Sequence, residues 1–480
     1  MIHIGDFPLL LSVYLIAMFA IGLSDRKRAA SGKAAFYLAN RSLSSWRTFA
    51  GLGSTTTGGT TTLVLCAVVA AHGLSGMWYD FAGAMGLGIL GFFLASRVRR
   101  CGSVTLPEIA GEMYGPSVRR VASLLVVSAQ IVWFALLTEA TQTVLTSVLG
   151  IGATRALVIS AIVFIAYTCF GGQYSVIRTD VVQYSLMWIG LIGIAVPFAW
   201  IEAGGFSGLR SLPSSTWSFP SGPSFSGTEV VAIVLTLGLP HLVGSDIYGK
   251  LLSARDERAA RAAAISAGIA KGLFGVGIGI TGLAAVRLGT VHGSETLVRT
   301  ILVAVPPGLS AFVLVALVAT MQSSCDSVLL TAVATTTEDL LPEWFHRRKE
   351  DSVAGPRILA ILIGGFGLLV ALVIRDLLET LKIGYTLFSS GLALPILVGF
   401  GPERWRPKDS WARAAMLAGG GVAMSARLAR TPLRQWFLER GVPAPVADSS
   451  PILAGLGVCA LVLVMGSGMR ILHRDERITV

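Results

Sequence analysis

Hydroxyl side chains interrupt an apolar stretch near the start of the chain. Residues 53–62 contain only Gly, Ser and Thr, and apolar sequence flanks them from about Trp46 to Ala71. Ser, Thr and Gly form helices poorly, and non-helical backbone at membrane depth survives only where protein or a water-filled cavity satisfies its polar groups. The stretch predicts a broken helix whose carbonyls and hydroxyls hold a small hard ion. The alternative is a close-packed interface of small residues between helices.

A second polar run lies inside another apolar stretch, late in the chain. Thr320, Ser323, Ser324 and Ser327 are spaced i, i+3, i+4 and i+7, which places four hydroxyls on one helix face. Asp326 lies beside that face, and an ionisable residue inside a membrane is a functional-site hypothesis by default. Such oxygen ligands are the kind that hard cations prefer. The alternative is that the hydroxyls bond back to carbonyls of their own helix.

The composition is that of a polytopic membrane protein. The chain has 480 residues, of which 53% are hydrophobic and 14% charged, and its mean hydropathy is +0.72. Soluble domains average about 25% charged residues. The five cysteines show no CxxC spacing, so the sequence predicts neither a zinc site nor a disulfide framework. The six histidines are dispersed and no nucleophile motif accompanies them, so an enzyme ranks last among the possible functions.

Apolar runs of the length that crosses a bilayer predict about thirteen membrane-spanning helices in an all-α protein. They lie near residues 7–24, 46–71, 76–97, 121–149, 155–170, 180–202, 228–249, 262–288, 309–336, 356–375, 380–400, 411–426 and 451–470. The Lys and Arg residues favour one side by about three to one, which places the N-terminus outside and the C-terminus in the cytoplasm. The net charge of +11 is therefore a topology signal, and nucleic-acid binding is not expected. Arg residues crowd one outer loop, 427–440, where a solvated surface is the simplest interpretation.

The second and seventh predicted spans are both interrupted. The seventh contains Pro240, which removes a helical hydrogen bond in mid-membrane. Because these spans are five apart, spans 2–6 and 7–11 could form two repeats of opposite topology, and matching interruptions point to a transporter's binding site. The predicted divisions are an extra helix and loop (1–45), a first repeat (46–202), an outer loop (203–227), a second repeat (228–400) and two C-terminal helices (401–480).

Five motifs, taken in order, resemble the sodium/solute symporter family, which includes the sodium–proline and sodium–sugar symporters. They are Asn40–Trp46, Thr105–Glu108 followed by Met113–Gly115, Gly171–Gly172 with Thr179–Asp180 and Gln183, Lys250–Ala260, and Met321–Ser327. The resemblance implies a LeuT-like 5+5 inverted repeat with one extra N-terminal and about two extra C-terminal helices.

The resemblance also implies ligands for sodium, the expected coupling ion. The main site would comprise backbone carbonyls of Ser54, Thr57 and Thr320 and hydroxyls of Ser323 and Ser324. A second site, present in only some members, would comprise Asp180, Ser323, Asp326 and Ser327.

Substrate contacts are implied less directly. Asp80 and Lys271 stand where sodium–sugar symporters have Glu and Lys, and they read as a buried pair or as polar anchors. Alternatively, Asp80 faces outer water and Lys271 snorkels. Trp133 and His241 stand at positions of aromatic substrate contacts in proline symporters. The remaining expected contacts are Gly58, Thr60, Thr61 and Leu237, of which the last two replace amides of sugar symporters and so disfavour a sugar.

Together these features predict a secondary active transporter of the plasma (inner) membrane. Alternating access would couple sodium entry to uptake of a small polar or anionic organic solute, with the protein acting as a monomer in the lipid bilayer. One alternative is a proton-coupled or uncoupled carrier of the same fold, in which His241 or Asp80 titrates. Another is a membrane sensor built on a symporter-like body.

Overall fold

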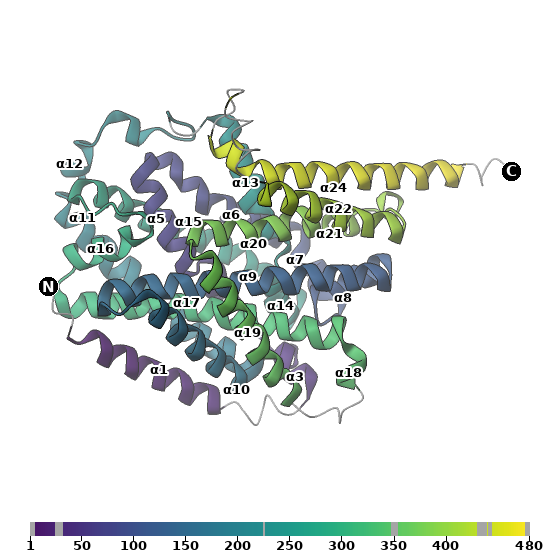
Figure 1. Cartoon of the computed structure of the whole chain (residues 1–480), viewed down its shortest axis with the longest axis horizontal. Helices are drawn as coiled ribbons and strands as arrows, with labels where there is room; N and C mark the ends of the chain where they lie inside the picture. The colour runs from purple at the N-terminus through teal and green to yellow at the C-terminus, as the bar shows by residue number, and fades with distance from the viewer. Residues whose placement is uncertain are drawn as a thin grey trace.

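The computed structural model describes residues 5–24, 32–223, 226–346, 354–429, 439 and 444–475. Within these ranges the chain is a bundle of helices without a β-strand, and an isolated β-bridge joins Leu43 to Ala254. The two ends of the chain lie at opposite ends of the bundle (Figure 1). The orientation of the two termini across the membrane stays a prediction.

The first half of the chain contains α1 (Phe7–Ser24), α3 (Lys33–Leu38), α4 (Ser45–Thr56), α5 (Gly59–His72), α6 (Trp78–Ile89), α7 (Ala95–Cys101), α8 (Leu106–Tyr114), α9 (Pro116–Leu149), α10 (Ala153–Met187), α11 (Val196–Glu202) and α12 (Gly205–Arg210). The second half contains α13 (Gly227–Val243), α14 (Ser245–Leu252), α15 (Glu257–Leu288), α16 (Thr296–Ala304), α17 (Pro307–Thr335), α18 (Pro342–His346), α19 (Ala354–Ile374), α20 (Leu377–Phe388), α21 (Leu394–Gly399), α22 (Asp409–Leu428) and α24 (Ala444–Asp475). Short π-helical turns join several of them: η3 (Leu90–Leu94), η4 (Trp188–Ala195), η7 (Thr336–Leu340) and η8 (Ser389–Ala393).

Ten stretches of the described residues are long and apolar enough to cross a membrane. Their positions follow the predicted spans closely, but two predicted spans are joined in one helical stretch over residues 61–101. The predicted spans 155–170 and 180–202 fall on α10 and its continuation, which bends at Gly172, where φ is 54°. The count of about thirteen spans stays a prediction.

Helix α17 is the centre of the bundle. The most apolar part of this helix is entirely buried, and it packs against α9, α10, α4 and α19. By contrast, α1 lies at the edge beside α10 (Figure 1) and buries Tyr14 and Met18 while exposing the apolar side chains of Val13 and Ile16. The four hydroxyl residues of the predicted polar face of α17 are therefore all buried, namely Thr320, Ser323, Ser324 and Ser327.

The predicted break in the second span is confirmed. Helix α4 ends at Thr56, and Thr57 (φ −101°, ψ 26°) and Gly58 (φ −54°, ψ 157°) leave the helical conformation before α5 begins at Gly59. A Cβ atom at Gly58 would overlap the Ser324 hydroxyl of α17. The stretch is thus a broken helix and also a close-packed interface of small residues, and ion binding there stays a prediction.

The predicted interruption at Pro240 is wrong in position. Helix α13 continues through Pro240 to Val243, and the backbone leaves the helix at Gly244 (φ −58°, ψ 131°) before α14. Proline has no N–H to donate to the carbonyl of residue 236. The Ser389 hydroxyl of η8 donates to that carbonyl instead, at 3.3 Å. A tertiary contact therefore satisfies the carbonyl that Pro240 frees, and the helix persists.

The two predicted repeats, 46–202 and 228–400, each begin with a broken helix, and their division of the chain stays a prediction. The arginine-rich loop differs from a simple solvated surface where it is described. Arg427 is 5% exposed and forms an ion pair with Glu379 at 3.0 Å. Arg430, Arg434 and Arg440 lie outside the described residues.

Candidate functional site

Oxygen atoms converge where the end of α4 meets the middle of α17. The Ser324 hydroxyl lies 3.4 Å from the Ser54 carbonyl, 3.2 Å from the Thr55 carbonyl and 3.2 Å from the Thr320 carbonyl. One hydroxyl hydrogen can be donated to only one of these acceptors at a time. The remaining carbonyl oxygens are thus gathered around a hydroxyl that cannot satisfy them all, which is the donor set a hard cation uses.

The two other residues of the predicted main sodium site flank this junction. Thr57 caps the end of α4, and its buried hydroxyl has no hydrogen-bond partner. Its carbonyl receives only a long contact of 3.5 Å from the Thr62 hydroxyl. Ser323 precedes Ser324 on α17 and donates to the Asp180 carboxylate at 2.6 Å. All five predicted residues lie at one place, and their oxygens fit sodium.

The alternative for the α17 hydroxyls is also partly realised. Thr320, Ser324 and Ser327 each lie within hydrogen-bond distance of a carbonyl of α17 itself. Only Ser324 in addition faces carbonyls of α4. The predicted polar face is thus split between helix-internal bonds and contacts to the broken helix.

A buried lysine forms an ion pair with Asp180, the carboxylate expected in the second sodium site. Asp180 on α10 forms an ion pair with Lys250 on α14 at 2.5 Å, and both side chains are almost completely buried. A Cβ atom added to Gly51 on α4 would lie 3.4 Å from each of these side chains. Through Ser323 and Lys250, Asp180 therefore joins α10, α17 and α14, close against α4. Breaking such a pair would leave an uncompensated buried charge.

The other residues of the predicted second site are only partly assembled. Ser327 donates to the Ser323 carbonyl and lies 3.2 Å from the Thr55 hydroxyl. Asp326 is directed to the first half of α10, where it accepts from Thr168 at 3.0 Å, and its other oxygen is buried without a partner. The structure gathers Asp180, Ser323 and Ser327, whereas Asp326 contacts α10 at Thr168, on the other side of the Gly172 bend from Asp180.

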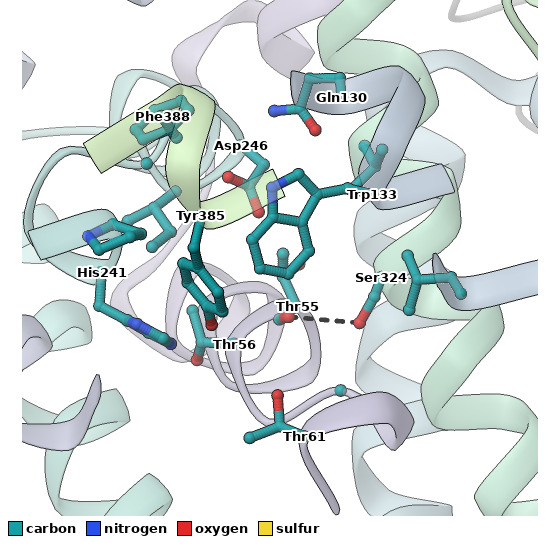
Figure 2. Close-up of a pocket in the computed structure, with 16 residues that line it drawn as sticks. Thr55, Thr56, Thr61, Gln130, Trp133, His241, Asp246, Ser324, Tyr385 and Phe388 are labelled. Carbon is teal, nitrogen blue, oxygen red and sulfur yellow. Dashed lines mark hydrogen bonds between the residues drawn. The ribbon is translucent and has the colours of Figure 1, made fainter. Parts of the chain in front are cut away.

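A cavity adjoins the sodium-site junction (Figure 2). Its empty volume, open solvent at its mouth included, is about 670 Å³. Helices α4, α5, α9, α13, α14, α17 and α20 contribute its walls. The lining residues are Thr55, Thr56, Gly58, Thr61, Gln130, Trp133, Leu137, Pro240, His241, Gly244, Asp246, Ile247, Ser324, Val328, Tyr385 and Phe388.

Four of the predicted substrate residues line this cavity, namely Gly58, Thr61, Trp133 and His241. Leu237 does not; its carbonyl lies 2.8 Å from the His241 Nδ1 atom and so helps to orient that ring. The side chain of Thr60 lies outside the described part of the structure.

The sequence interpretation missed Gln130, Asp246, Tyr385 and Phe388. Asp246 carried a usable signal, because it is an ionisable residue inside a predicted span. Tyr385 packs edge-to-face on Trp133 with ring centroids 4.9 Å apart. That contact joins α20 to α9, and spacing along the chain gives no indication of it.

Asp80 and Lys271 form a buried pair beside the cavity and do not line it. Their side chains meet at 2.5 Å and are 2% and 0% exposed, so Asp80 does not face outer water and Lys271 does not snorkel. The Lys271 ammonium also donates to the Thr56 carbonyl at 2.7 Å. The pair therefore stabilises the broken end of α4, and its expected direct contact with a solute is not supported by the cavity lining.

The sequence matches the model of the sodium:solute symporter family over residues 36–377, which is more than half of the chain. The chain belongs to this family. Among similar curated proteins is the osmoregulated proline transporter OpuE of Bacillus subtilis (strain 168), 25% identical over 452 residues that cover 86% of this chain and 87% of that protein. A sodium/proline symporter of Staphylococcus aureus (strain Newman) is 25% identical over 389 residues, or 76% of this chain and 73% of that protein.

Solved structures of similar fold include a Na⁺-coupled sialic acid symporter in a substrate-bound outward-open state. It superposes with a TM-score of 0.79 at 17% identity and covers 96% of this chain and 97% of its own. A nucleobase-cation-symport-1 family transporter in a closed conformation gives a TM-score of 0.59 at 14% identity, covering 89% of this chain and 94% of its own. These likenesses confirm the LeuT-like fold. With the ten apolar stretches, family membership makes this symporter-family member a multi-pass membrane protein.

Proposed function

We propose that this symporter-family member couples sodium entry to the uptake of a small polar organic solute by alternating access. One observation carries the proposal: Ser324 belongs to the oxygen cluster that fits sodium and also lines the cavity that fits a solute. An ion bound at that hydroxyl would adjoin the solute, so occupation of either site would affect the other. Coupling of this kind is reciprocal in binding free energy.

The sodium ligands we propose are the carbonyls of Ser54, Thr57 and Thr320 with the hydroxyls of Ser323 and Ser324. Sodium there would link α4 to α17. The membrane potential supplies about 2.3 kcal/mol per charge per 100 mV to drive the ion inward. Loss of the ion would free α4 from α17 and allow the helices around the cavity to move relative to α17.

A second sodium would require Asp180, Ser323, Asp326 and Ser327. The structure brings Asp180, Ser323 and Ser327 together, which supports this site. The ion pair of Asp180 with Lys250 opposes it, because the ammonium already neutralises that carboxylate. We therefore propose the second site as dependent on release of Lys250.

The lining of the cavity bears on the solute. From the sequence, a polar or an anionic solute was expected. Threonine hydroxyls, an amide, an imidazole and aromatic rings line the cavity, and its described lining includes no Lys or Arg. These groups support a polar solute and offer no cationic partner to a purely anionic one.

A second cavity supports a path for the solute. It is lined by Tyr37, Thr105 and Gln173, in or beside segments predicted to be cytoplasmic, and Asp246 lines both cavities. We propose that the solute leaves past Asp246 toward the cytoplasm. We also propose that the protein works as a monomer in the plasma membrane, with its N-terminus outside and its C-terminus in the cytoplasm.

Thermal unfolding of the purified protein in sodium against potassium tests the proposed coupling. We expect sodium to raise the unfolding temperature of the wild type and to leave Ser324→Ala unchanged. Ser310→Ala is the matched control, because Ser310 is buried on the same helix and its hydroxyl bonds only to the Pro307 carbonyl in the contacts described. Equal sodium stabilisation of Ser324→Ala and wild type would contradict the site.

A proton-coupled carrier is the second candidate function. Of the two residues proposed to titrate in it, His241 lines the cavity, whereas Asp80 is bonded to Lys271. Uptake into vesicles that follows a pH gradient and ignores sodium would favour that candidate.

A further inference from the structure

We propose that the transported solute carries a cationic nitrogen, which the cavity holds between the Asp246 carboxylate and the aromatic rings of Trp133 and Tyr385. This inference rests on the proposed function, because it names the solute class of the same cavity. It adds a binding residue, Asp246, that the sequence interpretation did not select.

Asp246 faces the cavity from the start of a helix. It lies in the first turn of α14, directly after the break at Gly244, where backbone N–H groups lack partners within the helix. The N-terminus of a helix stabilises a negative charge. The side chain is partly accessible and lines the cavity. Figure 2 shows it among Gln130, Trp133, Tyr385 and Phe388.

No protein cation within the described lining of the cavity neutralises this carboxylate. The nearest lysine along the chain, Lys250, is one turn further on α14, and its ammonium is bonded to Asp180 at 2.5 Å. Lys271, beside the cavity, is bonded to Asp80 and to the Thr56 carbonyl. Both lysines are thus paired with other carboxylates, and Asp246 is the acidic side chain that the described lining presents to an occupant.

Aromatic rings complete a site for a cation. Trp133 and Tyr385 contact each other edge-to-face in the cavity wall, and Phe388 follows Tyr385 by about one turn of α20. The faces of such rings attract cations, including quaternary ammonium groups. A carboxylate beside aromatic rings therefore suits an ammonium group, with or without its own hydrogen-bond donors.

The other solute classes fit this charge balance less well. A purely anionic solute would meet Asp246 with no cation in the lining to offset the repulsion. A neutral solute such as a sugar would enclose the carboxylate without a counter-charge, and burying an unpaired charge is costly. A cationic nitrogen on the solute removes that cost. Both a zwitterion and a simple cation carry such a nitrogen.

Thermal stabilisation of the full-length protein in sodium tests the inference with four probes. L-Proline and glycine betaine are zwitterions with a cationic nitrogen, and choline is a simple cation. Tetrahydrofuran-2-carboxylate is the matched control, because it replaces the proline nitrogen with oxygen. We expect at least one nitrogen probe to stabilise the protein and the oxygen analogue to fail. Stabilisation by the oxygen analogue as strongly as by proline, or by none of the nitrogen probes, would overturn the inference.

Substitution of Asp246 then locates the contact. With the probe that binds best, Asp246→Asn should weaken the apparent affinity at least tenfold and Asp246→Glu should weaken it less. Glu202→Gln, at an exposed acidic residue outside the cavity, should change nothing. Unchanged affinity in Asp246→Asn would overturn the inference. Sodium alone should still stabilise Asp246→Asn, so failure here is distinct from failure of the sodium site, which Ser324→Ala reports.

Discussion

The two helix breaks of this symporter-family member are built in different ways. At the α4–α5 break, side chains of other helices reach the backbone: Lys271 bonds to the Thr56 carbonyl and Ser324 approaches the Ser54 and Thr55 carbonyls. At the α13–α14 break, Gly244 lies in the cavity wall and Asp246 follows it with its carboxylate facing the cavity. Both breaks line the cavity, but side chains of other helices bond to the backbone of the first, whereas the second presents a carboxylate to the occupant. This difference underlies our proposal that the first break binds the ion and the second recognises the solute.

The largest expected effect comes from removing the lysine that stabilises the first break. Lys271→Ala would leave Asp80 charged and unpaired in a buried position and would free the Thr56 carbonyl. Removing one partner of a buried pair costs about 3–5 kcal/mol. The unfolding temperature in detergent should fall sharply. The double variant Asp80→Asn with Lys271→Met should recover part of the loss; a stability equal to that of Lys271→Ala alone would contradict the role of the pair.

Ser324→Ala should act on the same break with a smaller effect on stability. The variant loses one hydrogen bond, a change of about 1 kcal/mol, but it also removes a proposed ligand of sodium. We expect sodium affinity to fall at least tenfold in a direct sodium-binding assay, with wild-type folding in potassium. A variant that binds sodium normally would assign ion binding elsewhere.

Gly244→Ala tests the second break by itself. A Cβ atom there would lie 2.8 Å from the Pro240 carbonyl oxygen and 2.9 Å from Ile247 Cδ1, so the wall of the cavity must shift. Overpacking of this kind costs about 1–3 kcal/mol. Solute affinity should fall while sodium affinity in the absence of solute stays near the wild-type value. An equal loss of both would mean that the two breaks do not differ in function.

The smallest expected effect concerns the carbonyl that Pro240 leaves without a partner. Ser389→Ala should reduce stability by about 1 kcal/mol, because the Thr236 carbonyl loses its donor. In a Pro240→Ala background the backbone N–H of residue 240 can take over, so the same serine substitution should cost less. Thermal unfolding of the four proteins measures this difference, and additive effects would contradict the compensation.

The sequence predicted the first break well and the second poorly for a physical reason. Residues 53–62 predict a helix break from local sequence alone, because hydroxyls and glycines in an apolar span favour non-helical backbone that protein or water must satisfy. Pro240 predicted an interruption, but Ser389, almost 150 residues later, satisfies the freed carbonyl and moves the break to Gly244. Such tertiary compensation has no local signature.

The residues of the site were likewise predictable where the signal is local and unpredictable where it depends on tertiary contacts. The hydroxyls of α17 were identifiable because four of them share a helical period, and the positions of most helices followed from apolar runs. A buried pair of Asp80 and Lys271 was one of the alternatives offered by the sequence and is confirmed, but only the structure shows that Lys271 also donates to the Thr56 carbonyl. Tyr385 joins the cavity through its contact with Trp133, a pairing that depends on how α20 crosses α9.

The central claim is that sodium and solute bind at adjoining sites joined by Ser324. Its most direct test is the affinity of the purified protein for sodium, measured by calorimetry with and without a saturating solute from the probe panel. We predict that the solute raises sodium affinity, that sodium raises solute affinity by the same factor, and that Ser324→Ala abolishes both effects. Sodium and solute affinities that are independent of each other in the wild type would contradict the account.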